Sequence, residues 1–169
     1  MLNLTFKEIP ATDEQQVREL IKHVLGGLKE KDFFIPYEEW EYRSFFDPSY
    51  GLIHGAYDKE TLVGISQLYY SEAIISEAKN ILGISEYGCG ELGGNLVLPD
   101  YRGHGIMYTL GKLQIKLAKE SGDRFVFALA HPDNIGSKKS LDKIGFTLQK
   151  TQATSSGYLR DFFIIDFQN

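Results

Sequence analysis

The chain has 169 residues, with 23 acidic against 18 basic side chains and a formal net charge of −5. This acidic balance, with a pI near 5.4, argues against a nonspecific nucleic-acid binder. Hydrophobic residues at 43% and charged residues at 24% make an ordinary globular mixture, which excludes disorder for most of the chain. We therefore predict one globular domain over residues 1–169.

The N-terminal segment predicts a strand followed by two helices. Residues 2–9 alternate apolar and polar side chains, as a half-buried strand does. Thr12 and Gln15 have the spacing of a capping box, so we expect a helix from this point to the paired glycines further on. A second, aromatic-rich helix is expected over 36–46, with Pro36 at its first position.

The middle of the chain predicts a hairpin and a segment that fits two kinds of structure. Apolar strands over 51–57 and 61–70 are joined by the polar turn 58–60. Residues 71–87 fit either a short helix or a lid. The segment is longer than a simple hairpin connection needs, and long connections often carry specificity.

The remaining elements alternate between strands and helices. In order they are a glycine-containing strand (92–98), a long helix (103–121), a buried strand (125–130), a short helix (134–144), a strand (146–150), a polar turn (151–157) and a last strand (158–167). The paired glycines Gly93 and Gly94 inside a strand indicate a bulge or a close backbone approach. The whole order predicts a mixed α/β (α+β) fold.

The cysteine count and the apolar runs bear on location and metal binding. Cys89 is the single cysteine, so it forms no internal disulfide, and no Cys/His cluster has zinc spacing. No apolar run approaches the ~18 residues of a membrane span. We therefore expect a cytoplasmic protein with no metal, no membrane partner and no nucleic-acid partner.

The most informative segment is 96–110, which runs from a strand through a glycine-containing turn into a helix. Free N–H groups and the positive end of the helix dipole converge at such a turn, which is typical of phosphate or pyrophosphate binding. Gly103 and Gly105 let a ligand approach the backbone. The alternative is a plain helix start.

Two other phosphate-binding motifs do not fit this segment. A dinucleotide fingerprint needs a glycine or alanine where Tyr108 stands. A P-loop needs serine or threonine where Leu113 follows Lys112.

Two signatures make the sequence resemble the GNAT superfamily of N-acetyltransferases. The first is Val-x-Pro-x-Tyr-Arg-Gly-x-Gly-Ile, met by Val97, Pro99, Tyr101, Arg102, Gly103, Gly105 and Ile106. The second is Asn-x-x-Ser/Ala followed by Gly-Phe, met by Asn134, Ser137, Gly145 and Phe146. The resemblance covers nearly the whole chain. It implies a mostly antiparallel sheet of six to seven strands flanked by about four helices.

The resemblance also implies transfer of an acetyl group from acetyl-CoA to a primary amine. Turn amides would hold the CoA pyrophosphate, and the backbone of the preceding strand would hold the pantetheine arm. An amide near Asn95 would polarise the thioester carbonyl, and Asn134 would contact the arm. The implied cofactor-binding residues are Asn95, Leu96, Val97, Arg102, Gly103, His104, Gly105, Ile106, Met107, Asn134 and Ser137.

The sequence departs from the family pattern at two positions. Met107 stands where the turn usually has glycine or alanine, so its side chain must point away from the phosphates. Leu141 stands where many members have the tyrosine that protonates the leaving thiolate. Another acid, a water or none must serve instead. The nearby candidates are Ser137, Ser140 and His131.

For the acceptor side, the resemblance points to Glu91 as the base that takes a proton from the amine. A solvated strand glutamate is the alternative, and Glu86 and His131 are weaker candidates. We expect 71–87 to cover the acceptor side. The aromatic residues that would line either the acceptor cleft or the core are Tyr37, Trp40, Phe45 and Phe46.

The acceptor itself is not identified by the sequence. Small-molecule and protein amines remain open, and the acidic balance favours a cationic acceptor. A noncatalytic acyl-CoA-binding sensor or regulatory module is the alternative function. The apolar last strands would allow a homodimer.

Overall fold

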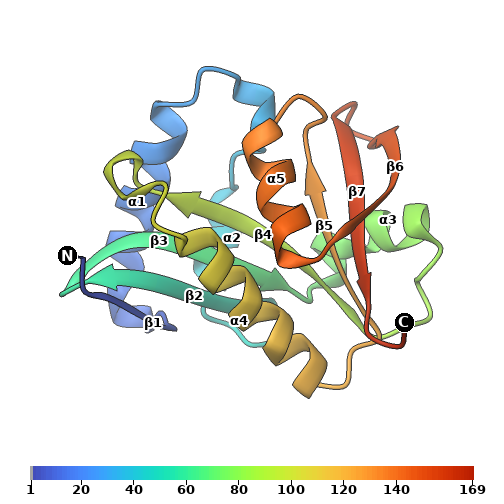
Figure 1. Cartoon of the computed structure of the whole chain (residues 1–169), viewed down its shortest axis with the longest axis horizontal. Helices are drawn as coiled ribbons and strands as arrows, with labels where there is room; N and C mark the ends of the chain where they lie inside the picture. Colours follow the sequence, from blue (N-terminus) through green and yellow to red (C-terminus); the bar gives the residue numbers. More distant parts are fainter. Residues whose placement is uncertain (1) are drawn as a thin grey trace.

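A seven-stranded mixed sheet forms the centre of the computed structural model, which describes residues 2–169 (Figure 1). The strands are β1 (Leu4–Glu8), β2 (Gly51–Asp58), β3 (Thr61–Tyr69), β4 (Cys89–Val97), β5 (Phe125–Ala130), β6 (Thr147–Ala153) and β7 (Leu159–Asp166). Their order across the sheet is β1-β2-β3-β4-β5-β7-β6. Neighbours pair antiparallel except β4 and β5, which are parallel and lie at the centre.

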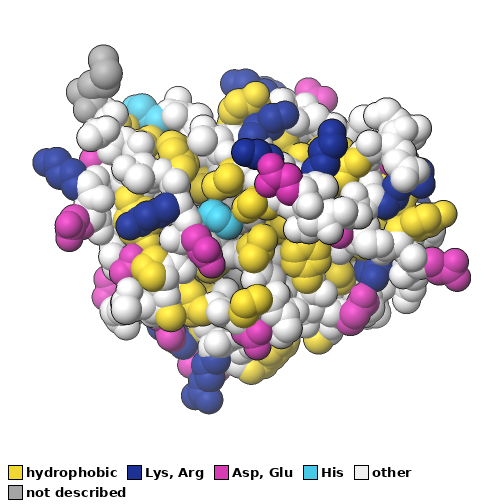
Figure 2. All heavy atoms as spheres, turned by 90° about the horizontal axis from the view of Figure 1, so that it is seen from below, with side chains coloured by type: hydrophobic (Ala, Val, Ile, Leu, Met, Phe, Trp, Pro, Cys, Tyr) yellow, Lys and Arg dark blue, Asp and Glu magenta, His cyan; other side chains and the backbone are white. Residues whose placement is uncertain are grey.

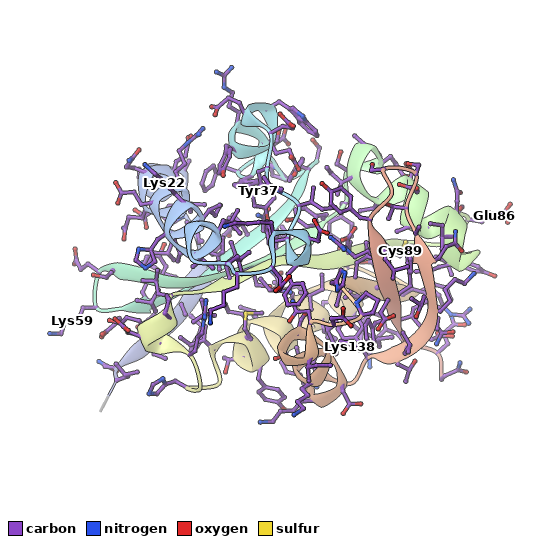
Figure 3. The ribbon with its side chains drawn as sticks, turned by 90° about the horizontal axis from the view of Figure 1, so that it is seen from above. Lys22, Tyr37, Lys59, Glu86, Cys89 and Lys138 are labelled. Carbon is purple, nitrogen blue, oxygen red and sulfur yellow. The ribbon has the colours of Figure 1, made fainter. Side chains whose placement is uncertain are left out.

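Helices cover both faces of the sheet. They are α1 (Glu14–Gly26), α2 (Glu39–Ser44), α3 (Glu72–Leu82), α4 (Ile106–Glu120) and α5 (Ile135–Ile144). The first three lie on one face and the last two on the other, as the view along the sheet shows (Figure 3). Short 3₁₀ turns are Ala11–Asp13, Lys31–Phe33 and Pro99–Tyr101. Within residues 2–169, every helix is too short or too polar to cross a membrane.

The core has two layers because the central strands are apolar on both faces. In β5, Phe125 and Phe127 pack toward α1 and α3, while Val126 and Ala128 pack toward α4 and α5. This pattern agrees with the prediction of a strand covered on both sides. α1 adds a buried stripe at helical spacing, made of Val17, Leu20, Ile21 and Val24.

The predicted fold class and strand count are confirmed. The hairpin over 51–57 and 61–70 is also present, as β2 and β3. Residues 71–87 contain a helix, α3, which raises the helix count over the described chain to five rather than about four. The segment therefore contains the predicted short helix.

The expected start signals of the first two helices are wrong. Thr12 lies inside a 3₁₀ turn, so α1 begins after Asp13, and Gln15 instead donates to Glu19 at 2.8 Å. The second helix does not begin at Pro36. α2 begins at Glu39, where Glu38 and Glu41 form a reciprocal capping box.

Two boundaries also differ from prediction. α4 begins at Ile106 instead of residue 103, because the backbone at Gly103 and Gly105 is left-handed (φ of +80° and +75°). β6 runs to Ala153 through residues predicted as turn, because they continue the antiparallel pairing with β7. Polar side chains fit this position since β6 is an edge strand with exposed residues.

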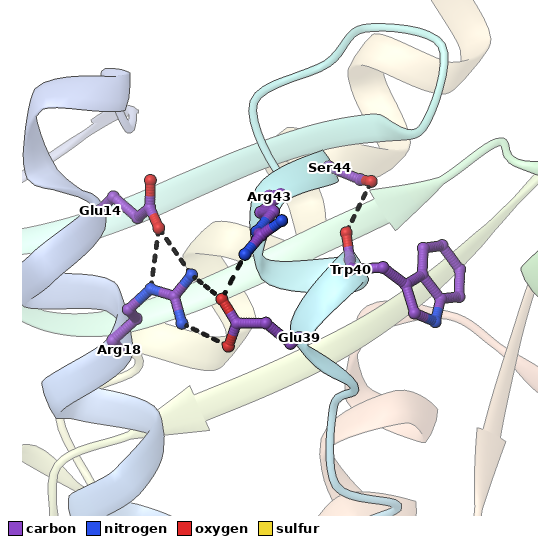
Figure 4. Close-up of polar contacts among 6 residues, drawn as sticks. All are labelled: Glu14, Arg18, Glu39, Trp40, Arg43 and Ser44. Atoms are coloured by element: carbon purple, nitrogen blue, oxygen red, sulfur yellow. Dashed lines mark hydrogen bonds and ion pairs between the residues drawn. The ribbon is translucent and has the colours of Figure 1, made fainter.

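The short α2 is fixed to α1 by ion pairs (Figure 4). Arg18 lies 2.8 Å from Glu14 on its own helix and 3.0 Å from Glu39 on α2. Arg43 lies 3.7 Å from the same Glu39 carboxylate. These contacts hold α2, with the aromatic residues around it, over the face of the sheet that carries α1.

The surface seen from below mixes charges of both signs around a central group of hydrophobic side chains (Figure 2). A hollow of about 370 Å³ lies between β1, β2 and the end of α2. Its apolar lining consists of Ile9, Pro10, Ala11, Phe45, Phe46, Pro48, Leu52 and Ile53.

Candidate functional site

The turn before α4 presents backbone donors without partners. Gly105 is the N-cap of α4 and provides no side-chain acceptor. Among residues 2–169, no hydrogen-bond acceptor faces the N–H groups from Gly103 through Met107. A fifteen-residue helix adds the positive end of its dipole at the same point. The turn therefore has the donor arrangement that binds phosphate groups.

The side chains of this turn do not cover its amides. The Arg102 side chain folds back, with Nε donating to the Val97 carbonyl at 3.3 Å. The Nδ1 atom of His104 lies 3.2 Å from the Tyr101 carbonyl. Met107 packs against a buried cluster that includes Ile106, so its side chain points into the protein and away from the turn, as predicted.

The central strands β4 and β5 separate beyond Glu91. Their pairing consists of three rows, of which Glu91 opposite Phe127 is the last. Further on, 92–97 of β4 and 128–130 of β5 have no partners in each other. This divergence opens a slot between two parallel strands that leads along β4 to the turn before α4. Unpaired strand backbone in this slot can bond an extended ligand arm.

A bulge in β4 lies beside the slot. Ser66 of β3 faces two residues of β4, Gly94 and Asn95, which is the predicted bulge. Gly94 has a φ of +58°, and a Cβ there would clash with the Tyr37 hydroxyl oxygen. Only glycine fits this position. The Asn95 side chain accepts from the Ser66 hydroxyl at 2.7 Å, so its backbone is what remains for a ligand.

Glu91 is a partly buried glutamate at the start of the slot. Burial raises its pKa to about 8. Among the described residues, no side chain donates to it and no cation pairs with it. Its strand neighbour on the same face is Tyr69. A carboxyl group with a raised pKa beside the slot is chemically suited to accept a proton near neutral pH.

Two tyrosine hydroxyls meet over the bulge. The Tyr37 and Tyr69 oxygens are 2.6 Å apart, and Gln67 donates to Tyr37 at 3.0 Å. Each phenol has one hydroxyl hydrogen, and the hydrogen bond between the two tyrosines uses one of them. The second hydroxyl hydrogen has no acceptor among residues 2–169. Burial raises the pKa of both phenols, so both stay protonated.

Sequence reasoning named Tyr37 but missed Tyr69 and Gln67. Both lie on β3, two residues apart, so they share one face of the strand. Polar groups at alternate positions of an otherwise apolar strand were the available signal. Of the other predicted aromatic residues, Phe45 is buried in the core, Phe46 packs against it, and Trp40 is exposed.

The second signature has a local structural role at α5. The Asn134 side chain accepts from the Ser137 backbone N–H at 3.2 Å and caps the helix. Its amide nitrogen has no partner in the described chain. Leu141 is buried against α4 and β5, so this helix position supplies no acid. The Ser140 hydroxyl donates to the Gly136 carbonyl at 3.1 Å.

The remaining residues with reactive side chains differ in where they lie. Glu86 lies at the outer end of the molecule, away from Tyr37 (Figure 3). Cys89 is buried, and burial raises the pKa of its thiol to about 11, which opposes a nucleophilic role. His131 lies just beyond β5, where its ring contacts Phe33 with centroids 5.2 Å apart.

One family model matches most of the chain. The model of the acetyltransferase (GNAT) family matches residues 15–146. No curated protein sequence matches the chain.

Solved structures with the same fold extend over nearly the whole chain. The NatC complex bound to Gag peptide and CoA is 17% identical, covers 98% of this chain and 99% of its own, and has a TM-score of 0.73. The ribosomal-protein-S18-alanine N-acetyltransferase from Escherichia coli is 12% identical, and the match covers 97% of this chain and 94% of that enzyme with a TM-score of 0.71. The yncA protein from Salmonella typhimurium, solved with acetyl-CoA, is 14% identical, covers 96% and 93%, and has a TM-score of 0.72.

Proposed function

Because the chain belongs to the GNAT family of acetyltransferases, we propose that it transfers the acetyl group of acetyl-CoA to a primary amine. The observation that carries this proposal is the continuous path from unpartnered turn amides, along the β4–β5 slot, to the bulge and Glu91. The amides of 103–107 would hold the pyrophosphate. The backbone of 95–97 would hold the pantetheine arm. The asparagine that caps α5 would contact that arm through its free amide nitrogen.

Direct attack in a ternary complex fits the residues along this path. The amine arrives as an ammonium ion, and only its neutral form attacks the thioester. Glu91, whose pKa is raised to about 8, takes that proton when it is ionised. The backbone amide at Asn95 would donate to the oxygen of the tetrahedral intermediate. Cys89 would not form an acyl-enzyme, since its thiol stays protonated.

The tyrosine pair over the bulge would add a second donor. Its unpartnered hydroxyl hydrogen lies beside Gly94, next to the amide expected to bind the oxyanion. A protonated phenol stabilises developing negative charge by a hydrogen bond. The C–S bond breaks as the tetrahedral intermediate collapses, and the CoA thiolate would leave and take its proton from water, since Leu141 supplies no acid.

We predict that Tyr37→Phe combined with Tyr69→Phe, which removes both hydroxyls of the pair, lowers kcat by about 10-fold or more, since loss of one oxyanion donor costs up to about 10²–10³-fold. The dissociation constant of acetyl-CoA should stay unchanged, because the rings still pack in place. Steady-state kinetics with calorimetric titration of acetyl-CoA checks this. Tyr70→Phe is the control, since that hydroxyl bonds Asp123 at 2.6 Å instead. Equal kcat values for the double variant and the unaltered protein would contradict the role.

The acceptor is the open part of the proposed function. Incubation with acetyl-CoA and a panel of polyamines, aminoglycosides, amino acids and peptides, followed by mass spectrometry, tests for a product 42 Da heavier than one amine. Peptides belong in the panel because one structural neighbour is bound to a peptide and another is named for a ribosomal protein. Binding of acetyl-CoA without any product would instead favour the noncatalytic acyl-CoA-binding module.

We place this activity in the cytoplasm. The free thiol of Cys89 fits a reducing compartment.

A further inference from the structure

Arg160 is a buried cation without an acidic partner. Its side chain, at the start of β7, is 5% exposed. Among residues 2–169, no carboxylate oxygen lies within 4.0 Å of its guanidinium. Arginine is seldom buried this deeply unless an anion pairs with it. The contrast is Arg124, which flanks the other end of β7 and pairs with Asp166 at 2.8 Å.

The contacts of Arg160 leave part of its donor capacity free. Nη1 donates to the Leu159 carbonyl at 2.7 Å, and Nη2 donates to the Asp32 carbonyl at 2.8 Å. The guanidinium carbon lies 5.2 Å from the centre of the Tyr158 ring. The other three N–H groups have no acceptor in the described chain. Burial lowers the pKa of the guanidinium, and the Asp32 charge opposes this only in part.

Arg160 faces the same side of the sheet as Glu91. Side chains alternate along β7, and Phe162 packs with Phe127 on the α1 side. Asp161 faces the opposite side, where it pairs with Lys138 of α5 at 2.6 Å. Tyr37 and Lys138 lie on opposite sides of the sheet in Figure 3.

Strand register places Arg160 beside the far end of β5. Ala130 pairs with Asp161, so the next row on this side brings His131 opposite Arg160. The unpaired end of β5 is one wall of the slot, and β7 is the next strand beyond it. Arg160 therefore lies one strand spacing, about 5 Å, from that wall.

We propose that Arg160 binds a carboxylate of the acceptor, which makes the acceptor an amine that also carries a carboxylate. ω-Amino acids and short peptides have this chemistry. The three free N–H groups are enough for a bidentate carboxylate pair. The net charge of −5 describes the whole molecule, whereas this local cation determines what binds beside it. The inference rests on the proposed function, because the slot is where the acetyl group would lie.

Binding to the CoA-loaded protein tests the inference without turnover. The probes are glycine, 4-aminobutyrate, 6-aminohexanoate and glycylglycine, each compared with its carboxamide by calorimetric titration in saturating CoA. We expect the acids to bind at least about 10-fold more tightly than their amides. Amides that bind as tightly as the acids would overturn the proposal, as would an absence of binding by every acid.

Arg160→Gln separates ligand binding from support of the loop at Asp32. The substitution should remove the acid-over-amide preference, a change of about 10–100-fold in the dissociation constants of the acids, and leave the amides unaffected. A purely structural role would weaken acids and amides alike. Arg124→Gln removes a cation from the opposite end of β7 and should keep the preference.

The two proposals fail in different ways. If the proposed function is wrong, acetyl-CoA and CoA do not stabilise the protein. If only the inference about Arg160 is wrong, CoA binds and the acid-over-amide preference is absent or survives Arg160→Gln.

Discussion

Glu91→Gln lowers kcat/KM by about 10²–10⁴-fold, the range that a positioned general base contributes. The carboxylate is the active form, and its pKa is raised to about 8. For the unaltered protein, log(kcat/KM) therefore rises with pH up to about 8, where an ordinary glutamate would already be fully ionised. In Glu91→Gln this rise of kcat/KM with pH disappears, and the pH dependence that comes from ionisation of the amine substrate remains. Initial rates between pH 6 and 10 check this.

The control is Glu86→Gln, an exposed glutamate at the outer end of the molecule. It should keep both the rate and the pH profile of the unaltered protein. Acetyl-CoA affinity should be the same in all three proteins. A Glu91→Gln protein with the unaltered pH profile would remove Glu91 from the mechanism.

Glu91→Gln should raise the stability of the folded chain although it lowers the activity. Glu91 binds its proton more tightly in the folded chain, so the folded state loses stability as pH rises from the usual carboxyl range through about 8. Each unit of pKa shift corresponds to about 1.4 kcal/mol. Glutamine has no such charge to bury. Glu91→Gln should therefore melt at a higher temperature than the unaltered protein at pH 9, and by a smaller margin at pH 5.

Gly105→Val weakens acetyl-CoA binding by about 10–100-fold or more. Gly105 has a φ of +75°, which a β-branched residue adopts only under strain. Relief of that strain moves the amides that follow, and one charge-assisted hydrogen bond is worth about 1.5–3 kcal/mol. Calorimetric titration with acetyl-CoA measures the change.

Gly122→Val is the matched control for backbone strain. Gly122 has a φ of +87° and lies just beyond the other end of α4. Both substitutions should lower the melting temperature by similar amounts, but Gly122→Val should bind acetyl-CoA as the unaltered protein does. Equal affinities for the two variants would place the pyrophosphate elsewhere.

The unusual backbone of the turn and of the bulge was easier to predict from the sequence than the starts of the first two helices. The turn around Gly103 and Gly105 and the bulge at Gly94 were predictable because glycine between a strand and a helix, or inside a strand, indicates a backbone that larger residues avoid. Glu91 was predicted through the family resemblance. The start of α2 was missed, because the reciprocal capping of Glu38 and Glu41 competes with a proline signal that is stronger in the sequence.

The tyrosine pair and Arg160 show what a single sequence does not reveal. Tyr37 and Tyr69 are 32 residues apart, and their contact exists only once α2 lies over β3. In the sequence Arg160 resembles any strand cation, and only the pairing of β7 with β5 brings it to the far end of β5. Both features depend on contacts between distant segments, which local patterns do not encode.

A thermal shift with acetyl-CoA tests the central claim most directly. Ligand at a hundred times its dissociation constant should stabilise the fold by about 2.7 kcal/mol, which is roughly 5–10 °C for a chain of this size. We predict this shift with acetyl-CoA and with CoA, and none with ATP. No shift with either CoA ligand, or an equal shift with ATP, would contradict acetyl-CoA as the group that binds along β4 and the start of α4.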